Sequence, residues 1–311
     1  MDTVAVVLEG PEKIAVRSLD LNPVREDDIV VEVSWSGISS GTERLLWSGR
    51  MPQFPGMGYP LVPGYETVGR VIETGANARH RLGEYVFLPG ATCYKDARGL
   101  FGGAARTLIA PSARAIQIQE RLGARGVLLA LAATAHHAIV GGAAPDLIIG
   151  HGVLGRLLAR ITVALDAPAP TVWDVNPVRR AGSFGYRVLD PQEDERTDYK
   201  TIIDASGAGA LLDSFVQRLA KGGEIVLAGF YEERLSFAFV PTFMREARLR
   251  VAAEWKPEDL QATQALMAAG RLSLDELITH EQLPEEAEGA YATAFTDSSC
   301  LKMVLDWRRC A

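Results

Sequence analysis

The stretch Asp146-Leu147-Ile148-Ile149-Gly150-His151-Gly152-Val153-Leu154-Gly155 joins a short apolar run to three glycines with the spacing G-x-G-x-x-G. The apolar run is too short for a buried helix, which favours a strand that stops at the first glycine. An apolar, helix-compatible run follows over 156–165. The order of strand, tight turn and helix is the context in which this spacing predicts a dinucleotide-binding turn. The alternative is a glycine-rich turn in another kind of α/β protein.

Each glycine of this turn has an expected role in holding a dinucleotide. Gly150 allows the tight turn, Gly152 lets the backbone approach the pyrophosphate, and Gly155 lets the helix pack closely on the strand. The helix N-terminus then faces the phosphate charge. Val153 and Leu154, which stand at that end of the helix, are therefore predicted cofactor-binding residues as well.

A second strand is predicted over 170–174, and it ends in Asp174. This acid follows the last glycine at about the 20-residue spacing expected of a carboxylate that binds the adenosine ribose. Such a carboxylate accepts hydrogen bonds from the ribose hydroxyls and repels a 2′-phosphate, which predicts NAD rather than NADP. Arg179 and Arg180 follow closely. They leave NADP open, because a nearby guanidinium holds a 2′-phosphate.

Composition excludes several classes of function. The chain has 311 residues, of which 48% are hydrophobic, and a net charge of −7. This suits a large core in about two domains and predicts no nucleic-acid partner. No apolar run reaches the ~18 residues of a membrane span, and no signal-peptide pattern is present, so no integral membrane segment is expected. Three widely spaced cysteines form no disulfide framework. A cytoplasmic location is expected, with loose membrane association left open.

The order of elements predicts three segments. Residues 1–122 alternate short β-rich runs with polar turns, whereas 123–272 alternate strands and helices in the rhythm of a doubly wound parallel sheet. A return segment, 273–311, ends in one more strand and is expected to complete the first domain. Two strands of the α/β region stop shortly before Gly207 and Gly229, which are predicted cofactor contacts in a cleft at the carboxyl ends of the sheet.

Four segments resemble the medium-chain dehydrogenase/reductase superfamily of the alcohol-dehydrogenase type, and the resemblance covers essentially the whole chain: 37–43, 63–69, 101–103 and 146–155. It implies an α/β fold with a Rossmann doubly wound parallel sheet and a β-rich GroES-like catalytic domain. Members that use zinc read G-I-C-G-T-D and G-H-E at two of these segments. Here Ser40 stands in the cysteine position, Tyr65 in the histidine position, and Ala130 near the third ligand position. These are poor zinc ligands, so no metal is expected.

Within the superfamily, three segments resemble the family of 3-hydroxyethyl bacteriochlorophyllide a dehydrogenases: 40–43, 64–69 and 133–138. The resemblance implies a tetrapyrrole substrate, a bacteriochlorophyllide, whose 1-hydroxyethyl group is oxidised to acetyl with NAD as the hydride acceptor. It also implies a homodimer. A rival hypothesis is a zinc-free reductase of quinones or activated alkenes that uses NADPH. A second rival is a nucleotide-binding sensor that kept the fold and lost the chemistry.

Without a metal, side chains have to hold the reacting oxygen and accept its proton. Tyr65 is the leading catalytic candidate, although its ordinary pKa of ~10 has to be lowered, or a neighbour has to help, before it acts as a base. Thr42 occupies the position that passes the proton outward in zinc-using relatives, and His137 or His136 completes a relay to solvent. The alternatives are a packed tyrosine ring, a hydroxyl that caps a turn, and core histidines with satisfied hydrogen bonds.

Two apolar stretches are candidates for contact with a flat ring system. Residues 51–60 contain methionine and aromatic side chains, which adapt to such faces. The alternative is a loop packed on its own domain. Residues 236–244 help from the other domain or lie at a subunit interface.

Overall fold

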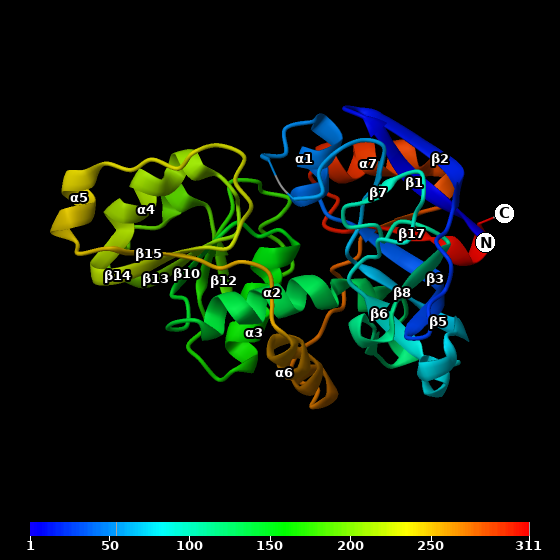
Figure 1. Cartoon of the computed structure of the whole chain (residues 1–311). Coiled ribbons are helices and arrows are strands. Elements are labelled where there is room, and N and C mark those ends of the chain that lie inside the picture. Colours follow the sequence, from blue (N-terminus) through cyan, green and yellow to red (C-terminus); the bar gives the residue numbers. More distant parts are fainter. Residues whose placement is uncertain (54, 311) are drawn as a thin grey trace. The chain divides into compact units, whose positions relative to one another are not determined.

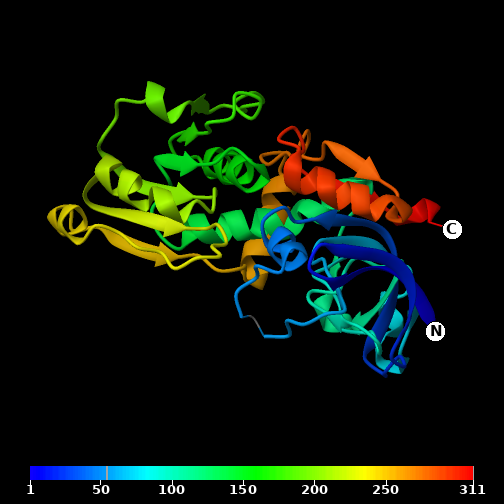
Figure 2. The same cartoon turned by 90° about the horizontal axis from the view of Figure 1, so that it is seen from above.

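The computed structural model describes residues 1–53 and 55–310 as two compact units. Unit 1 comprises Met1–Leu129 together with Asp275–Ala311, and unit 2 comprises Ala130–Leu274. Both views show the red C-terminal segment beside the blue N-terminal strands (Figures 1 and 2). The chain therefore leaves unit 1 once, builds unit 2 without interruption, and returns.

Unit 2 is a six-stranded parallel sheet with the strand order β12-β11-β10-β13-β14-β15. The order runs outward in one direction from β10 to β12 and then resumes on the other side of β10 with β13, which creates the switch point of a doubly wound sheet. The predicted fold class is confirmed. The strands are β10 (Leu147–Ile149), β11 (Thr171–Trp173), β12 (Arg187–Leu189), β13 (Tyr199–Asp204), β14 (Leu219–Leu227) and β15 (Arg248–Val251). The helices are α2 (Leu129–Val140), α3 (Val153–Ala164), α4 (Leu212–Arg218), α5 (Phe239–Met244) and α6 (Pro257–Ala268).

Burial explains why so short a run as β10 forms a strand at the centre of this sheet. All three of its residues are buried, as expected of a parallel strand covered on both faces. Leu147 pairs with Thr171 on one side and with Ile202 on the other, in parallel register. The register places the carboxyl ends of β10, β11 and β13 at one edge of the sheet.

Unit 1 is built from two sheets. The larger has the order β16-β17-β3-β5-β6-β9, with β8 paired to β3, and the smaller has the order β2-β1-β4-β7. β17 is antiparallel to β3, with Met303 opposite Ile38. The strands are β1 (Asp2–Gly10), β2 (Lys13–Asp20), β3 (Asp28–Ile38), β4 (Leu61–Val62), β5 (Thr67–Thr74), β6 (Tyr85–Leu88), β7 (Arg98–Gly99), β8 (Thr107–Pro111), β9 (Ile116–Gln117), β16 (His280–Gln282) and β17 (Met303–Asp306), with the helices α1 (Thr42–Ser48) and α7 (Ala287–Thr296).

One run, Glu120–Val140, meets the length and composition of a membrane-crossing helix. The sequence expectation counted uninterrupted apolar residues and did not identify it. Its backbone leaves the helical conformation at Gly123, where φ is +53° and ψ is −137°. The regular α-helix within it, α2, has 12 residues, which at 1.5 Å per residue is shorter than a ~30 Å hydrocarbon core. Of the apolar window, 61% is buried inside the protein, as in the core helix of a globular domain.

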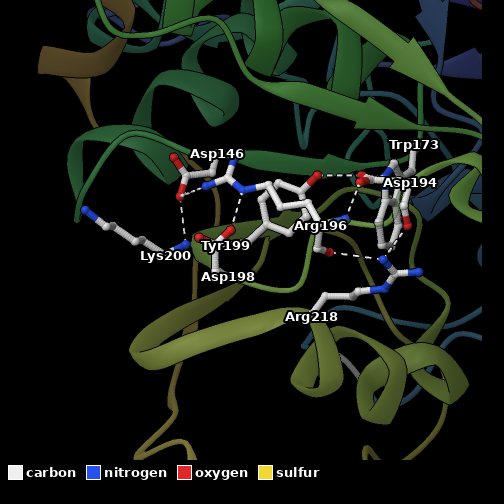
Figure 3. A network of polar contacts seen from close by, with 8 residues as sticks. All are labelled: Asp146, Trp173, Asp194, Arg196, Asp198, Tyr199, Lys200 and Arg218. Carbon is white, nitrogen blue, oxygen red and sulfur yellow. Dashed lines mark hydrogen bonds and ion pairs between the residues drawn. The ribbon is translucent and has the colours of Figure 1, made fainter.

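A polar network fixes the connection between β12 and β13 to the sheet (Figure 3). The Asp194 carboxylate accepts hydrogen bonds from the Trp173 indole Nε1 at 2.7 Å, from the Tyr199 hydroxyl, and from the Arg196 backbone N–H at 2.9 Å. Arg218 donates to the backbone carbonyl of Asp194. Burial acts to raise the pKa of Asp194, but these donors outweigh it and lower the pKa overall.

Replacing Asp194 with alanine is expected to lower the free energy of unfolding by about 2–4 kcal/mol, because two buried donors, on Trp173 and Tyr199, lose their acceptor. Since the folded-state pKa is lowered, the wild-type contribution is present above the ordinary carboxyl pKa and is lost as the pH falls through the folded value. Urea unfolding at pH 7 and pH 3 measures both effects. Asp198→Ala is the control, because its side chain is 78% exposed and its ion pair is worth at most ~1 kcal/mol.

Candidate functional site

The glycine turn of unit 2 packs tightly against the helix that follows it. Gly150 directly follows β10 and has φ at +94°, a conformation that favours glycine. A Cβ added to Gly155 would lie 1.8 Å from the Gly150 carbonyl oxygen, so the first turn of α3 rests directly on the turn. Gly152 precedes α3, which begins at Val153, with Leu154 next. A helix N-terminus behind a bare glycine backbone fits a dinucleotide pyrophosphate.

Asp174 lies beside this turn. Its carboxylate accepts a hydrogen bond from the His151 backbone N–H at 2.8 Å and another from the Asn176 backbone N–H at 2.8 Å. An ionised carboxylate has about four acceptor positions, so capacity remains for ribose hydroxyls. The role of Asp174 in cofactor choice stays a prediction.

The glycines predicted at two further strand ends lie together with the turn. A Cβ added to Gly229 would lie 2.9 Å from the Gly207 backbone nitrogen, and one added to Gly150 would lie 3.3 Å from Ser206. Gly207 itself has φ at +71°. The three glycines therefore form one bare backbone surface at the carboxyl ends of β10, β13 and β14, where a doubly wound sheet binds its ligand.

Sequence reasoning missed His151, the middle residue of the first G-x-G. It is fully buried, with Nδ1 at 2.6 Å from the Arg179 carbonyl oxygen and Nε2 at 2.9 Å from the Tyr186 hydroxyl. Since a carbonyl only accepts, Nδ1 carries the proton and Nε2 accepts from Tyr186. Burial, with Arg156 and Arg160 nearby, lowers the pKa of His151 to about 4. The ring is therefore neutral at pH 7.

Arg156, the residue after the third glycine, was also missed. Its buried guanidinium donates to the carbonyl oxygens of four residues: His151, Arg179, Ala181 and Gly182. These bonds fix the loop after β11 against the glycine turn. The sequence did contain a signal for both residues, because His151 and Arg156 are polar residues within an otherwise apolar run at 147–158.

The two arginines that left NADP open are placed differently. Arg180 pairs with the Asp190 carboxylate at 2.7 Å and donates to the Asp174 backbone carbonyl at 3.2 Å. A Cβ added to Gly152 would lie 3.9 Å from Nη1 of Arg179. Arg179 is thus the arginine whose guanidinium lies beside the predicted phosphate turn.

In unit 1, the structure brings the predicted catalytic residues Tyr65 and Thr42 together. The Tyr65 hydroxyl lies 2.6 Å from the Ser39 hydroxyl, and its ring packs edge-on against Phe101 at 5.1 Å between centroids. Burial of the hydroxyl, helped by the Glu66 charge, raises the pKa of Tyr65, and the hydroxyls of Ser39 and Thr42 do not compensate. A base at neutral pH requires the opposite shift. The environment instead favours a protonated Tyr65 that donates a hydrogen bond.

The partner of Tyr65 is Ser39, whereas the sequence analysis considered Ser40, and only as the residue in the cysteine position of zinc-using relatives. Ser39 is buried and Ser40 is exposed. The stretch 37–43 has one residue more than G-I-C-G-T-D, so matching from Thr42 selects Ser40 and matching from Gly37 selects Ser39. The extra residue was the signal that both serines needed consideration.

Comparison with known proteins identifies the family of the chain. Residues 25–120 match the alcohol dehydrogenase GroES-like domain. The chain is 55% identical over 311 residues to the 2-desacetyl-2-hydroxyethyl bacteriochlorophyllide A dehydrogenase of Rhodobacter capsulatus, with 99% of each chain covered. It is 56% identical to the protein of the same name from Cereibacter sphaeroides, with 100% of each covered. The chain belongs to this family. The predicted resemblance is confirmed.

Solved structures of the wider superfamily share the fold of this family member. Acetophenone reductase from Geotrichum candidum, in complex with NAD, superposes with a TM-score of 0.85 at 16% identity, covering 99% of this chain and 98% of that one. At such low identity the likeness concerns the fold alone.

The two histidines predicted to form a proton relay, His136 and His137, lie in unit 2. His136 and His137 on α2 each place Nδ1 at 2.8 Å from one oxygen of the Asp259 carboxylate on α6. Asp259 also accepts the Lys256 backbone N–H at 2.9 Å. The pair therefore ties α2 to the start of α6, and a relay role for His137 stays a prediction.

Four residues of the predicted substrate stretch line a pocket of about 580 Å³: Met51, Gln53, Pro55 and Met57. Phe54, part of the predicted substrate stretch, lies outside the described residues. Two thioethers and one amide suit a broad, partly apolar face. Within residues 1–53 and 55–310, no group of three or more His, Cys, Asp or Glu side chains is placed to hold a metal ion. Ala130 is buried on α2.

Proposed function

We propose that this chain oxidises the 3-(1-hydroxyethyl) group of a bacteriochlorophyllide to a 3-acetyl group, with NAD as hydride acceptor, in bacteriochlorophyll a biosynthesis. The observation that carries the proposal is full-length identity of 55–56% to two relatives that bear the corresponding name. The chain is an oxidoreductase that acts on an alcohol. The glycine turn and the Tyr65 hydroxyl supply the two parts this chemistry needs.

The reaction removes a hydride from the carbinol carbon and a proton from its oxygen. NAD supplies the hydride acceptor when bound. The chain's own task at the oxygen is to hold developing negative charge, and a protonated Tyr65 does this by donating a hydrogen bond. Ser39 and Thr42, whose hydroxyls interact with that of Tyr65, orient the donor, and the proton released from the alcohol oxygen passes to solvent water.

We also propose that this chemistry proceeds without zinc. A catalytic zinc site needs about three nitrogen, sulfur or carboxylate ligands. The side chains at the three positions used by zinc-dependent relatives are a serine hydroxyl, the Tyr65 phenol and the Ala130 methyl group. Neither hydroxyl matches the thiolate and imidazole that zinc prefers. One tightly held zinc ion per chain in the purified, active protein would refute this proposal.

NAD is the proposed cofactor because the Asp174 carboxylate lies at the turn and would repel a 2′-phosphate. Asp174→Asn is expected to weaken NADH binding about tenfold, the loss of a charge-assisted hydrogen bond, and to tighten NADPH binding. Fluorescence titration with both reduced cofactors measures the ratio. The exposed Asp198→Asn is the control. Preference of the wild-type protein for NADPH would contradict the assignment and point to Arg179 as a phosphate ligand.

We propose a homodimer formed through α5 and β15. This face exposes apolar side chains: Phe239 at 69%, Val240 at 67%, Phe243 at 64%, Met244 at 65% and Val251 at 72%. β15 ends the strand order of unit 2, and among the described residues no strand pairs with its outer edge. An exposed apolar patch beside an open edge strand favours association. Sedimentation analysis of wild type against Val251→Lys tests it.

A cytoplasmic location is proposed as well, supported by three buried cysteines in the free thiol form.

The activity is tested directly by mixing the purified protein with NAD and 3-hydroxyethyl bacteriochlorophyllide a. The expected result is a pigment absorption shift in step with NADH formation. Reduction of quinones by NADPH in its place would favour the reductase hypothesis. Tight NAD binding without turnover of either substrate would favour a sensor.

A further inference from the structure

The peptide group between Ile38 and Ser39 is held at both ends by buried charges. The Lys302 ammonium donates to the Ile38 carbonyl oxygen at 3.1 Å. The backbone N–H of Ser39 donates to Oε1 of Glu43 at 3.0 Å. These two bonds engage the oxygen and the nitrogen of one planar unit, so they fix its orientation.

The charges have further partners inside unit 1. Lys302 also donates to both oxygens of the Glu66 carboxylate, at 2.7 and 3.0 Å. Oε2 of Glu43 accepts the Tyr291 hydroxyl of α7 at 2.8 Å. Glu43 and Glu66 are fully buried and Lys302 is 3% exposed. With positive charge at the carbonyl and negative charge at the N–H, both ends of the peptide dipole favour the same orientation.

We propose that this peptide clamp, formed by Glu43 and Lys302 on the Ile38–Ser39 peptide, aims the Ser39 hydroxyl at Tyr65 and thereby positions the Tyr65 hydroxyl for the reacting alcohol oxygen. The inference rests on the proposed function. Glu43 is a positioning residue: it acts through Ser39, whose Oγ lies 2.6 Å from the Tyr65 hydroxyl. Among the described residues, Glu43 supplies the carboxylate that accepts the Ser39 N–H.

The clamp depends on the ionisation of Glu43. A bond to a carboxylate is roughly twice as strong as one to a neutral acceptor. The groups that face Glu43 are the Ser39 N–H, Tyr291 on α7, Glu66, Lys302 and the protonated Tyr65 hydroxyl. Burial raises the pKa of Glu43 to about 7, Glu66 adds to the rise, and Ser39, Tyr291 and Lys302 oppose it. The clamp therefore tightens as the pH rises through about 7, and kcat for alcohol oxidation rises with it.

The first test is the pH profile of Glu43→Gln, which keeps the shape of the side chain and removes its charge. At pH 8 kcat is expected to fall about tenfold, the loss of one charge-assisted bond, and the rise of kcat near pH 7 disappears. The Kd for NADH, measured by fluorescence, stays unchanged. Glu288→Gln, at an exposed position of α7, is the matched control and keeps the wild-type profile. A Glu43→Gln profile that still rises near pH 7 overturns the proposal.

Tyr291→Phe provides a milder variant if Glu43→Gln fails to fold. The Tyr291 hydroxyl stabilises ionised Glu43, so its loss moves the midpoint of the kcat profile to higher pH. An unmoved midpoint overturns the clamp.

A spectroscopic readout separates this inference from the proposed function. In wild type the amide resonance of Ser39 is expected to titrate near pH 7, and in Tyr291→Phe at higher pH. If the wild-type protein does not oxidise the pigment, the proposed function fails, whereas the amide titration still decides whether Glu43 controls the Ser39 peptide. An amide resonance that does not titrate between pH 5 and 9 refutes the clamp.

Discussion

Replacing Tyr65 with phenylalanine is expected to lower kcat for pigment oxidation by about 10²-fold or more, the typical loss of a positioned proton donor. Phenylalanine keeps the ring and its edge-on contact with Phe101, so the change removes the hydroxyl alone. Because burial raises the pKa of Tyr65, this hydroxyl is protonated at neutral pH. The lost interaction is therefore a hydrogen bond to the reacting oxygen, which is strongest as that oxygen gains negative charge.

The measurement for Tyr65→Phe is steady-state turnover with saturating NAD, together with NADH binding. The Kd for NADH should not change, because the Tyr65 hydroxyl is expected to contact the alcohol oxygen, whereas the glycine turn is expected to hold the cofactor. Tyr85→Phe, on β6 of the same unit, is the control and should keep wild-type turnover. A loss of less than about fivefold in Tyr65→Phe means that another group holds the oxygen.

The parts predictable from sequence are those whose determinants are local. The strand, turn and helix at 146–165 are contiguous, so glycine spacing and apolar pattern sufficed to place Gly150 and Gly155. Gly207 and Gly229 were predictable for a related reason, since parallel strands end at one edge of the sheet. The sequence pattern alone was therefore enough to predict that Gly150, Gly207 and Gly229 lie at the same edge of the sheet in unit 2.

The surroundings of Tyr65 were only partly predictable from the sequence, because the contacts there join residues that are far apart in the chain. Ser39 meets Tyr65 across 26 positions, Glu43 meets Tyr291 across 248, and Lys302 reaches Ile38 across 264. No periodicity encodes such pairs. The direction of the Tyr65 pKa shift was hidden for the same reason, since it depends on burial and on the neighbouring Glu66 charge.

His151 shows a different limit. Its position in the first G-x-G was visible, but sequence reasoning treated that position as a spacer. Only the fold reveals that the imidazole lies between the Arg179 carbonyl and the Tyr186 hydroxyl. The buried, neutral His151 and the buried Arg156 hold the loop after β11 in place. These contacts explain why two polar residues stand in an otherwise apolar run.

Gly155→Ala is expected to have the second large effect, on both cofactor binding and stability. The third glycine of this pattern is alanine in some dinucleotide-binding proteins. Here, however, the added Cβ would lie 1.8 Å from the backbone oxygen of Gly150, well inside van der Waals contact, and a backbone atom does not swing aside. The helix α3 has to shift away from β10 and carries Val153 and Leu154 at its N-terminus with it.

The expected result of Gly155→Ala is NADH binding at least tenfold weaker and a free energy of unfolding lower by about 1–3 kcal/mol, the usual range for overpacking. Gly289→Ala is the matched control: it is a helical glycine on α7 whose added Cβ meets no atom within 4 Å. That exchange should stabilise by up to ~1 kcal/mol, because alanine has the higher helix propensity. Fluorescence titration and urea unfolding of both variants separate the steric clash from the propensity gain. Wild-type NADH affinity in Gly155→Ala would show that α3 does not have to rest on the turn to hold the cofactor.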